Sequence, residues 1–257
     1  MLSPHNADIV YYAANRLFRS FDKGRTWTAI SGDLTTSTQR GDVPYATITS
    51  VSESPKQFGL IWAGTDDGHV WVTTSGGDRW TAVDAQLPAD RWVSRVIASS
   101  HVRDRAYVAL NGYRNDDATP YLFASDDLGA HWRGIAKGLP DEAVNVVRED
   151  PVNADVLYVG TDRGVYVTLD RGASWTALDA GLPNVPVHDL VVHPRAQRRG
   201  LGSRLAARTI AALGAMDRKL FIVPSLKLIV VRTGQGAPDK DFNEKLWQLI
   251  DTAMPQH

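Results

Sequence analysis

The octapeptide SFDKGRTW, residues 20–27, occurs in three further versions: TTSGGDRW at 73–80, SDDLGAHW at 125–132 and TLDRGASW at 168–175. Each copy begins with Ser or Thr, has Gly in fifth place and ends with Trp, and three of the four have Asp in third place. A short side-chain oxygen that accepts local backbone N–H groups, followed by a Gly that can take a positive φ, indicates a tight β-hairpin corner. We therefore predict four equivalent corners, each closed by a largely buried tryptophan.

The third, fifth and last positions of each octapeptide define these corners. They are Asp22, Gly24 and Trp27 in the first copy, Gly77 and Trp80 in the second, Asp127, Gly129 and Trp132 in the third, and Asp170, Gly172 and Trp175 in the fourth. The second copy has Ser75 in place of Asp. We expect Asp127 and Asp170 to accept backbone N–H groups within their own octapeptides, with Gly129 and Gly172 at positive φ.

Two strand-like runs, with Gly, Asn or Asp between them, precede each octapeptide. The pairs occupy residues 8–20, 59–73, 105–125 and 155–168, where β-branched and aromatic residues recur with a period of two. A further strand-like run precedes the later pairs, and a short one follows each octapeptide. Three long strands and a short one make a four-stranded antiparallel blade, so we predict a mainly β fold with about four β-propeller blades.

The octapeptide resembles the Asp box, or BNR repeat, of the sialidase and sortilin type β-propellers, and the resemblance covers residues 1–193. It implies a noncatalytic scaffold that binds a protein or glycan through its loops or, as an alternative, a glycoside hydrolase of the sialidase type. The propeller part resembles exported bacterial proteins, whereas residues 1–10 have neither the basic nor the apolar region of a signal peptide. We leave the localisation unassigned.

The number of strands leaves two ways to complete the propeller. The first unit lacks its leading strand, while VHDLVVHP at 187–194 is a leading strand without the rest of a blade. That strand could complete the first blade and close a four-bladed ring, or the blades could form an open arc of a larger propeller. We favour the arc, because propellers of the Asp-box type generally need more than four blades to close.

The sequence changes character after residue 194, and we predict two domains, propeller blades at 1–194 and a composite α/β tail at 195–257. Residues 190–205, LVVHPRAQRRGLGSRL, are similar to the acetyl-CoA loop of the GNAT acetyltransferases, with Gln197, Gly200 and Gly202 on its fixed positions. Backbone N–H groups at a Gly-rich helix N-terminus can hold a pyrophosphate. This resemblance implies, as a further alternative, an acetyl-CoA-binding acetyltransferase remnant.

The rest of the tail predicts a helix at 203–213, two strands within 219–233 and a second helix at 242–253. This order resembles the C-terminal end of serine hydrolases of the β-lactamase and penicillin-binding type. The Ser-x-x-Lys tetrad of that family occurs only at 20–23, inside the first octapeptide, so we infer no hydrolase activity. We interpret the chain as a composite, which is natural, truncated or chimeric, and expect its tail strands to lie beside residues 187–193 as an incomplete fifth blade.

Composition excludes several partners. A net charge of -1 and a pI near 6.7 give no reason to expect nucleic acid, and no run reaches the ~20 apolar residues of a membrane span. The 257 residues include no cysteine, and the histidines lack metal-ligand spacing. We therefore expect no cofactor, no metal site and no membrane span.

Sialidase-type chemistry would need paired carboxylates, or a Tyr nucleophile with an acid, and we name six candidate carboxylates in three pairs. They are Asp66 and Asp67, Asp116 and Asp117, and Glu149 and Asp150. The sequences at 66–68 and 162–164 occupy equivalent places between strands, and turn formation explains both. We therefore favour a noncatalytic protein.

The loop NGYRNDDATP, residues 111–120, replaces a much shorter turn in the other blades. It carries Tyr113 and Arg114, whose residue types are enriched at binding hot spots, beside Asp116 and Asp117. We predict that these four residues contact the protein or glycan ligand.

Overall fold

The computed structural model describes residues 1–36, 46–178, 186–193, 209–213, 219–223 and 228–232. Within these ranges the chain forms five antiparallel sheets, which we call the first to fifth blades. The first contains β1 (Val10–Ala13), β2 (Leu17–Ser20) and β3 (Thr28–Ala29); the second β4 (Ile48–Glu53), β5 (Ile61–Thr65), β6 (Val70–Thr73) and β7 (Thr81–Ala82); the third β8 (Trp92–Ala98), β9 (Ala106–Gly112), β10 (Asp117–Ser125) and β11 (Arg133–Gly134); the fourth β12 (Val144–Glu149), β13 (Leu157–Thr161), β14 (Val165–Thr168) and β15 (Thr176–Ala177); the fifth β16 (Asp189–His193), β17 (Thr209–Leu213), β18 (Lys219–Val223) and β19 (Leu228–Arg232).

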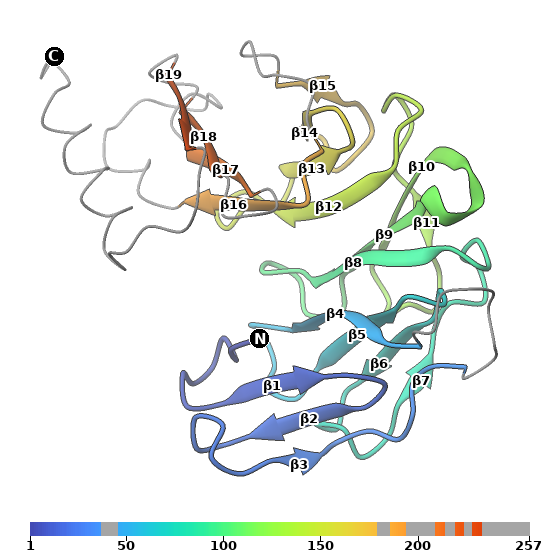
Figure 1. Cartoon of the computed structure of the whole chain (residues 1–257), viewed down its shortest axis with the longest axis vertical. Coiled ribbons are helices and arrows are strands. Elements are labelled where there is room, and N and C mark those ends of the chain that lie inside the picture. Colours follow the sequence, from blue (N-terminus) through green and yellow to red (C-terminus); the bar gives the residue numbers. More distant parts are fainter. Residues whose placement is uncertain (37–45, 179–185, 194–208, 214–218, 224–227, 233–257) are drawn as a thin grey trace, which may run out of the picture.

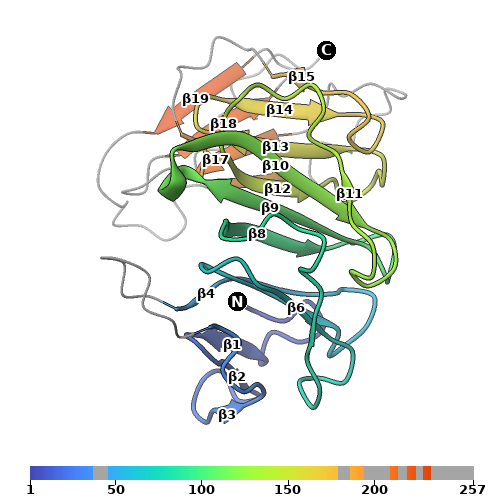
Figure 2. The same cartoon turned by 90° about the vertical axis from the view of Figure 1, so that its right-hand side faces the viewer.

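The blades follow one another along an open arc, with the first and fifth blades at its two ends (Figures 1 and 2). Their leading strands are neighbours, since β4 contacts β8, β8 contacts β12 and β12 contacts β16. The first blade has no leading strand among the described residues, and β16 pairs with β17 rather than with β1. The predicted open arc of propeller blades is therefore confirmed, and the closed four-bladed ring is not formed.

The second strand of a blade is buried on both faces where the blade lies between two others. Every residue of β5, β9 and β13 is buried. Because alternate side chains point to opposite faces, Ala63 belongs to an apolar cluster with Leu17 of the first blade, while its neighbour Trp62 belongs to another cluster with Val96 of the third. The apolar positions of these strands thus serve two blade interfaces at once.

The second and third blades lie in close contact where Gly64 of β5 faces Val93 of β8. A Cβ added to Gly64 would overlap the side chain of Val93. Gly160 of β13 has the same relation to Val187, which precedes β16. A glycine at this register position therefore lets the next leading strand pack directly on the preceding sheet.

The predicted helix at 203–213 is wrong over its C-terminal part. Residues 209–213 form β17, which pairs with β16 on one side and with β18 on the other. The run TIAAL fits a strand between two apolar strands as well as one stripe of a helix, and strand pairing decides between them. The two strands predicted within 219–233 are confirmed as β18 and β19, so the fifth blade has four strands rather than being incomplete.

Several predictions for the tail lie outside the described residues. They concern the positions Gln197, Gly200 and Gly202 and the helix at 242–253. The division into two domains at residue 194 stays a prediction, and the fifth blade takes strands from both sides of that boundary.

Candidate functional site

The octapeptide corners are built by the same hydrogen bonds in all four copies. The first-position hydroxyl accepts the backbone N–H of the fifth-position glycine, as from Gly129 to Ser125 Oγ at 2.9 Å and from Gly172 to Thr168 Oγ1 at 2.9 Å. Asp127 and Asp170 each accept the N–H four residues on at 2.9 Å, and Gly129 and Gly172 both have φ of 85°. The predicted backbone bonds and glycine conformations are confirmed, and the corners are structural.

The corner carboxylates are held ionised by these bonds. The pKa of Asp22, Asp127 and Asp170 is lowered to about 2, with the largest contribution from the Ser20 hydroxyl, the His131 ring and the Ser174 hydroxyl respectively. In the second copy Ser75 takes the place of Asp and accepts the N–H of Arg79 at 3.1 Å. A neutral hydroxyl therefore builds the same turn.

The tryptophans that end the octapeptides are less buried than predicted. Trp80, Trp132 and Trp175 are half-buried, and Trp27 is 43% exposed. The indole rings lie across a blade boundary, where each of the three half-buried ones donates Nε1–H to a carbonyl of the preceding blade. Each ring therefore packs against the edge of an apolar cluster and links two consecutive blades through its N–H group.

The predicted ligand loop begins as a short 3-10 helix after β9. At the start of η1 (Tyr113–Asn115), the Tyr113 N–H donates a hydrogen bond to Asn111 Oδ1 at 2.8 Å. It ends at Asp116, which has left-handed backbone angles with φ of 52°. Tyr113 is 72% exposed, so the turn presents its ring to solvent.

Asp117 anchors the far side of this loop. Its Oδ2 accepts hydrogen bonds from Arg91 Nε at 2.9 Å and from Tyr121 OH at 2.7 Å, while its Oδ1 accepts the Thr119 N–H at 3.0 Å. Thr119 makes the largest contribution to a lowered pKa of Asp117, and the bond from Asp117 raises the pKa of Arg91. The loop therefore carries a fixed carboxylate turned inward, not a free acid.

Arg114 connects the loop to the second blade. Its guanidinium lies 5.3 Å from the ring centroid of Trp92, and Nη1 lies 3.4 Å from Asp66 Oδ2. The Asp66 side chain is 3% exposed and also accepts the Thr47 N–H at 2.9 Å, whereas the Arg114 side chain is 38% exposed. The guanidinium of Arg114 is thus held by Trp92 and Asp66 while part of the side chain stays accessible to a ligand.

Of the predicted site residues, Tyr113 and Arg114 therefore lie side by side on an accessible, anchored turn. Asp116 is exposed at the end of the turn, and Asp117 faces Arg91. Arg91 and Trp92, which follow the Leu-Pro linker of the second blade, are not among the residues predicted from the sequence. Two large residues three and four positions after Pro88, where the other units have smaller side chains, are the signal that could have indicated them.

Asp66 and Asp67 are turn acceptors, as predicted for their position between strands. Asp67 accepts the Thr36 N–H at 2.7 Å and the Thr65 hydroxyl. Both carboxylates are buried, and both are engaged by backbone N–H groups. Neither is placed as a free acid or base.

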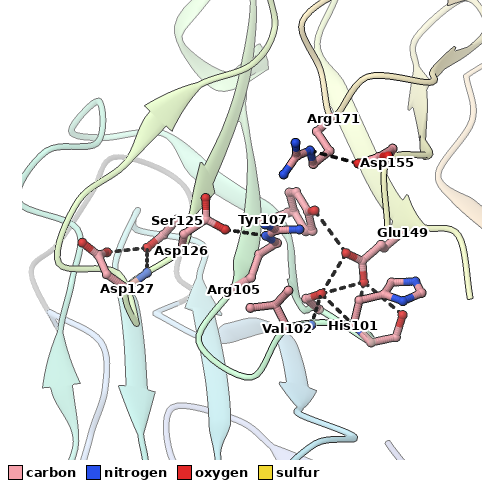
Figure 3. Close-up of polar contacts among 12 residues, drawn as sticks. His101, Val102, Arg105, Tyr107, Ser125, Asp126, Asp127, Glu149, Asp155 and Arg171 are labelled. Carbon is pink, nitrogen blue, oxygen red and sulfur yellow. Dashed lines mark hydrogen bonds and ion pairs between the residues drawn. The ribbon is translucent and has the colours of Figure 1, made fainter. Parts of the chain in front are cut away.

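Glu149 and Asp150 belong to a blade connection that the chain uses twice. Glu149 accepts hydrogen bonds from Ser99, Ser100 and Tyr107 OH (Figure 3). The ring of His101 contacts the Asp150 carbonyl at 2.7 Å. In the first two blades Glu53 accepts Ser3 Oγ at 2.5 Å and Tyr11 OH at 3.0 Å, and His5 contacts the Ser54 carbonyl at 2.8 Å. The repetition identifies Glu149 as a structural acceptor that joins consecutive blades.

A group of charged side chains on the leading strands is also not predicted from the sequence. Arg148 donates from Nε to the Leu190 carbonyl at 2.9 Å and from Nη2 to Asp189, which also lies 3.4 Å from Arg95 Nη2. Burial, followed by the neighbouring Arg148, lowers the pKa of Arg95. These side chains join the third, fourth and fifth blades. Because they lie far apart in the sequence, no local pattern indicates that they meet.

The described residues contain no group of three or more His, Cys, Asp or Glu side chains arranged to hold a metal ion. In the same part of the chain, no helix has the length and apolar character needed to cross a bilayer. A groove of about 710 Å³ lies between the second and third octapeptide corners, and its lining residues, among them Val72, Gln86 and Leu128, include none of the loop.

Comparison with known proteins supports the β-propeller. No protein-family model matches the chain. A vacuolar protein sorting/targeting protein 10 from Fusarium vanettenii is 27% identical over 130 residues, which is 48% of this chain and 8% of that protein. The chain thus spans a small part of this curated relative.

Solved structures with similar folds also support the β-propeller. A GH74 xyloglucanase from Xanthomonas campestris has a TM-score of 0.68 at 16% identity, covering 93% of this chain and 38% of that one. An ancestral GH74 enzyme has a TM-score of 0.63 at 16% identity, covering 91% and 30%, and YCF48 bound to D1 peptide has 0.56 at 14%, covering 88% and 65%. These likenesses show the fold alone and support the propeller resemblance, not the acetyltransferase or serine hydrolase ones. By fold, the chain is a β-propeller built as an open arc.

Proposed function

We propose that this protein is a noncatalytic β-propeller scaffold that binds a polypeptide segment at the turn formed by Tyr113 and Arg114. The observation that carries the proposal is the combination of a 72% exposed tyrosine with an arginine that is held by Trp92 and Asp66 but remains partly accessible. Tyrosine, tryptophan and arginine are the residue types that contribute most binding energy at protein interfaces.

The anchoring of the turn favours binding. Arg91 and Asp117 fix its C-terminal side, and Asn111 fixes its start, so little side-chain and backbone entropy would be lost when a ligand docks. Tyr113 could pack on an apolar residue of a peptide while Arg114 pairs with a peptide carbonyl or carboxylate. A peptide-bound propeller, YCF48 with D1 peptide, shares this fold, which supports testing peptides first.

The hydrogen bonds made by the six candidate carboxylates argue against the glycoside hydrolase alternative. Five of the six candidates accept hydrogen bonds that maintain turns, the loop or blade connections, and Asp116 is the exposed end of a 3-10 helix. A hydrolase needs one carboxyl group as acid and a second group as base or nucleophile on opposite sides of the scissile bond. The six candidates do not provide such a pair, because five of them are already engaged in these structural hydrogen bonds.

A parallel screen of the purified chain against a displayed peptide library and a glycan array tests the proposal. Peptide ligands are expected, and Tyr113→Ala and Arg114→Ala should each weaken the best one by about tenfold or more. Tyr12→Ala and Arg171→Ala are matched controls, because Tyr12 is also exposed and Arg171 forms an exposed ion pair with Asp155 on another blade. Glycan binding without peptide binding, or hydrolysis of a glycan, would contradict the proposal.

A further inference from the structure

The four octapeptide corners share one construction, and the second corner departs from it. In every copy the fourth residue donates its backbone N–H to the carbonyl two residues before β1, β5, β9 or β13 of the same blade. In the fourth blade these two residues, Arg171 and Asp155, also form an ion pair at 3.0 Å (Figure 3). In the second blade both are glycine, Gly76 and Gly59, and a Cβ on Gly59 would lie 3.0 Å from Gly76 Cα. The second corner is therefore bare at a place where the other three carry side chains.

Arg19 of the first blade reaches this bare corner. Its Nη1 donates to the Gly76 carbonyl at 3.1 Å, and a Cβ on Gly76 would lie 3.4 Å from the same nitrogen. Arg19 directly precedes the first octapeptide, and the residues in that place in the other three blades are buried and apolar, namely Val72, Ala124 and Val167. A cation thus lies at the boundary of the first and second blades, where the repeat otherwise uses an apolar side chain.

Two exposed phenylalanines flank the guanidinium. Arg19 Cζ lies 4.7 Å from the ring centroid of Phe21 and 5.8 Å from that of Phe58. Phe21 is 56% exposed and Phe58 is 45% exposed. The ring of Phe58 has an edge contact with the ring of His5, which in turn contacts the Ser54 carbonyl at 2.8 Å. We call Arg19, Phe21 and Phe58 the Arg19 site, in which a cation lies between two apolar rings that are open to solvent.

The exposure of these rings does not depend on what precedes the first blade. Phe58 belongs to the second blade, whose leading strand contacts the third. Phe21 is the second residue of its octapeptide, and the second residue of the fourth copy, Leu169, is also exposed although the fourth blade has neighbours on both sides. The Arg19 site is therefore a surface feature of a blade boundary whose two sides are both described.

Arg19 forms no ion pair in the part of the chain that the structure describes, and its Nε is buried there without an acceptor. Glu53, the buried carboxylate of this blade boundary, already accepts hydrogen bonds from Ser3 Oγ, Tyr11 OH and the Gly59 N–H. A guanidinium forms its strongest hydrogen bonds with a carboxylate, and aromatic rings beside it favour apolar groups next to that carboxylate. The charge and the rings together therefore select a ligand that is both acidic and apolar.

We propose that the Arg19 site binds an acidic segment of a partner polypeptide. An Asp or Glu carboxylate of the segment pairs with the Arg19 guanidinium, and the apolar residues beside it pack on the rings of Phe21 and Phe58. Arginine and aromatic residues are the types enriched at protein interfaces. The site is separate from the Tyr113 turn, because the β9–β10 connection and the corner between β10 and β11 lie at opposite ends of β10.

Selection of a displayed library of random dodecapeptides on the immobilised protein tests the proposal. Peptides with Asp or Glu beside apolar residues are expected, and Arg19→Val and Phe58→Ala should each weaken such a peptide by about tenfold or more in fluorescence anisotropy. Valine has the place of Arg19 in the second and fourth blades, so Arg19→Val removes the charge with a residue that the repeat accepts, and circular dichroism checks its fold. Leu169→Ala and Arg171→Ala change exposed residues of the fourth corner and are the matched controls, which should bind like the wild type.

A double-mutant cycle tests the contact between the guanidinium and the carboxylate. Changing the acidic residue of the peptide to its amide should weaken binding to the wild type by about tenfold and have little further effect on Arg19→Val. Tyr113→Ala should leave this binding unchanged, which distinguishes it from binding at the Tyr113 turn.

The proposal is overturned if no selected peptide depends on Arg19, or if the amide peptide binds as well as the acid. Two other occupants have their own readouts, namely self-association in sedimentation velocity and binding to phosphatidylserine vesicles. If Arg19→Val abolishes either of these while no peptide binds, the surface belongs to a second copy of the chain or to a membrane, and the proposal is wrong.

Discussion

The indole N–H of Trp175 donates to the carbonyl oxygen of Ile135 at 2.7 Å and so joins the fourth blade to the third. Trp175→Phe should keep most of the ring contact while leaving this carbonyl without its donor, and we expect a loss of about 0.5 to 1.5 kcal/mol in the free energy of unfolding. Trp27→Phe is the matched control, because Trp27 has no acceptor among the described residues, and it should be near neutral. Urea unfolding of both variants measures the difference. Equal losses would show that the hydrogen bond across the blade boundary is not the source.

Acid should destabilise the octapeptide corners. The pKa of Asp170 is about 2 in the folded chain, against an unfolded value of about 3.9. Between these values the unfolded state binds more protons, so this stability is present above pH 4 and is lost as the pH falls toward 2. Asp170→Asn should therefore melt earlier at pH 6 and show a shallower dependence of melting temperature on pH below 4. An unchanged slope would contradict this explanation.

Gly64 is expected to tolerate no side chain. Gly64→Ala would push a methyl group into Val93 at the boundary of the second and third blades, and overpacking of this kind costs about 1 to 3 kcal/mol. Gly32→Ala is the control, because a Cβ there meets nothing within 4 Å. Chemical denaturation compares the two variants. A stable Gly64→Ala protein would mean that the blades can separate without cost.

Truncation after Pro194 should destabilise the arc. It removes β17 to β19, so β16 would lose its pairing partner and become an exposed edge next to the fourth blade. Leu190, which has 0% exposure, would lie on that strand. We expect aggregation or an earlier melting transition, measured by light scattering and calorimetry. A soluble truncated chain with an unchanged transition would show that the tail contributes nothing to the stability of the blades.

Acetyl-CoA should not bind at the Gln197–Gly202 segment. The acetyltransferase resemblance requires a helix after the glycines, whose N-terminal N–H groups would hold the pyrophosphate. Residues 209–213 of the predicted helix form a strand instead. We expect no rise in melting temperature on titration with acetyl-CoA. A saturable rise that Gly200→Glu abolishes would restore the acetyltransferase hypothesis.

The sequence by itself determined the blade and its repetition. The hydroxyl, carboxylate and glycine of each octapeptide act within eight residues, so local chemistry alone specifies the corner, as the bonds of Asp127 and Asp170 confirm. The period of two specifies strands, and two apolar faces specify burial between neighbouring blades. The position of the Tyr113 loop followed in the same way from its unusual length.

Only the tertiary structure decided what each repeat contacts. The stripe at 209–213 fits a helix or a strand, and pairing with β16 and β18 selected the strand. Asp66 and Trp92, which hold Arg114, come from two different blades, so no local sequence pattern could predict this contact. Trp27 and Trp175 end equivalent octapeptides, yet Trp27 is exposed whereas Trp175 is half-buried and donates a hydrogen bond to the Ile135 carbonyl. The physical reason is that the burial of a repeated residue depends on whether another blade lies beside it.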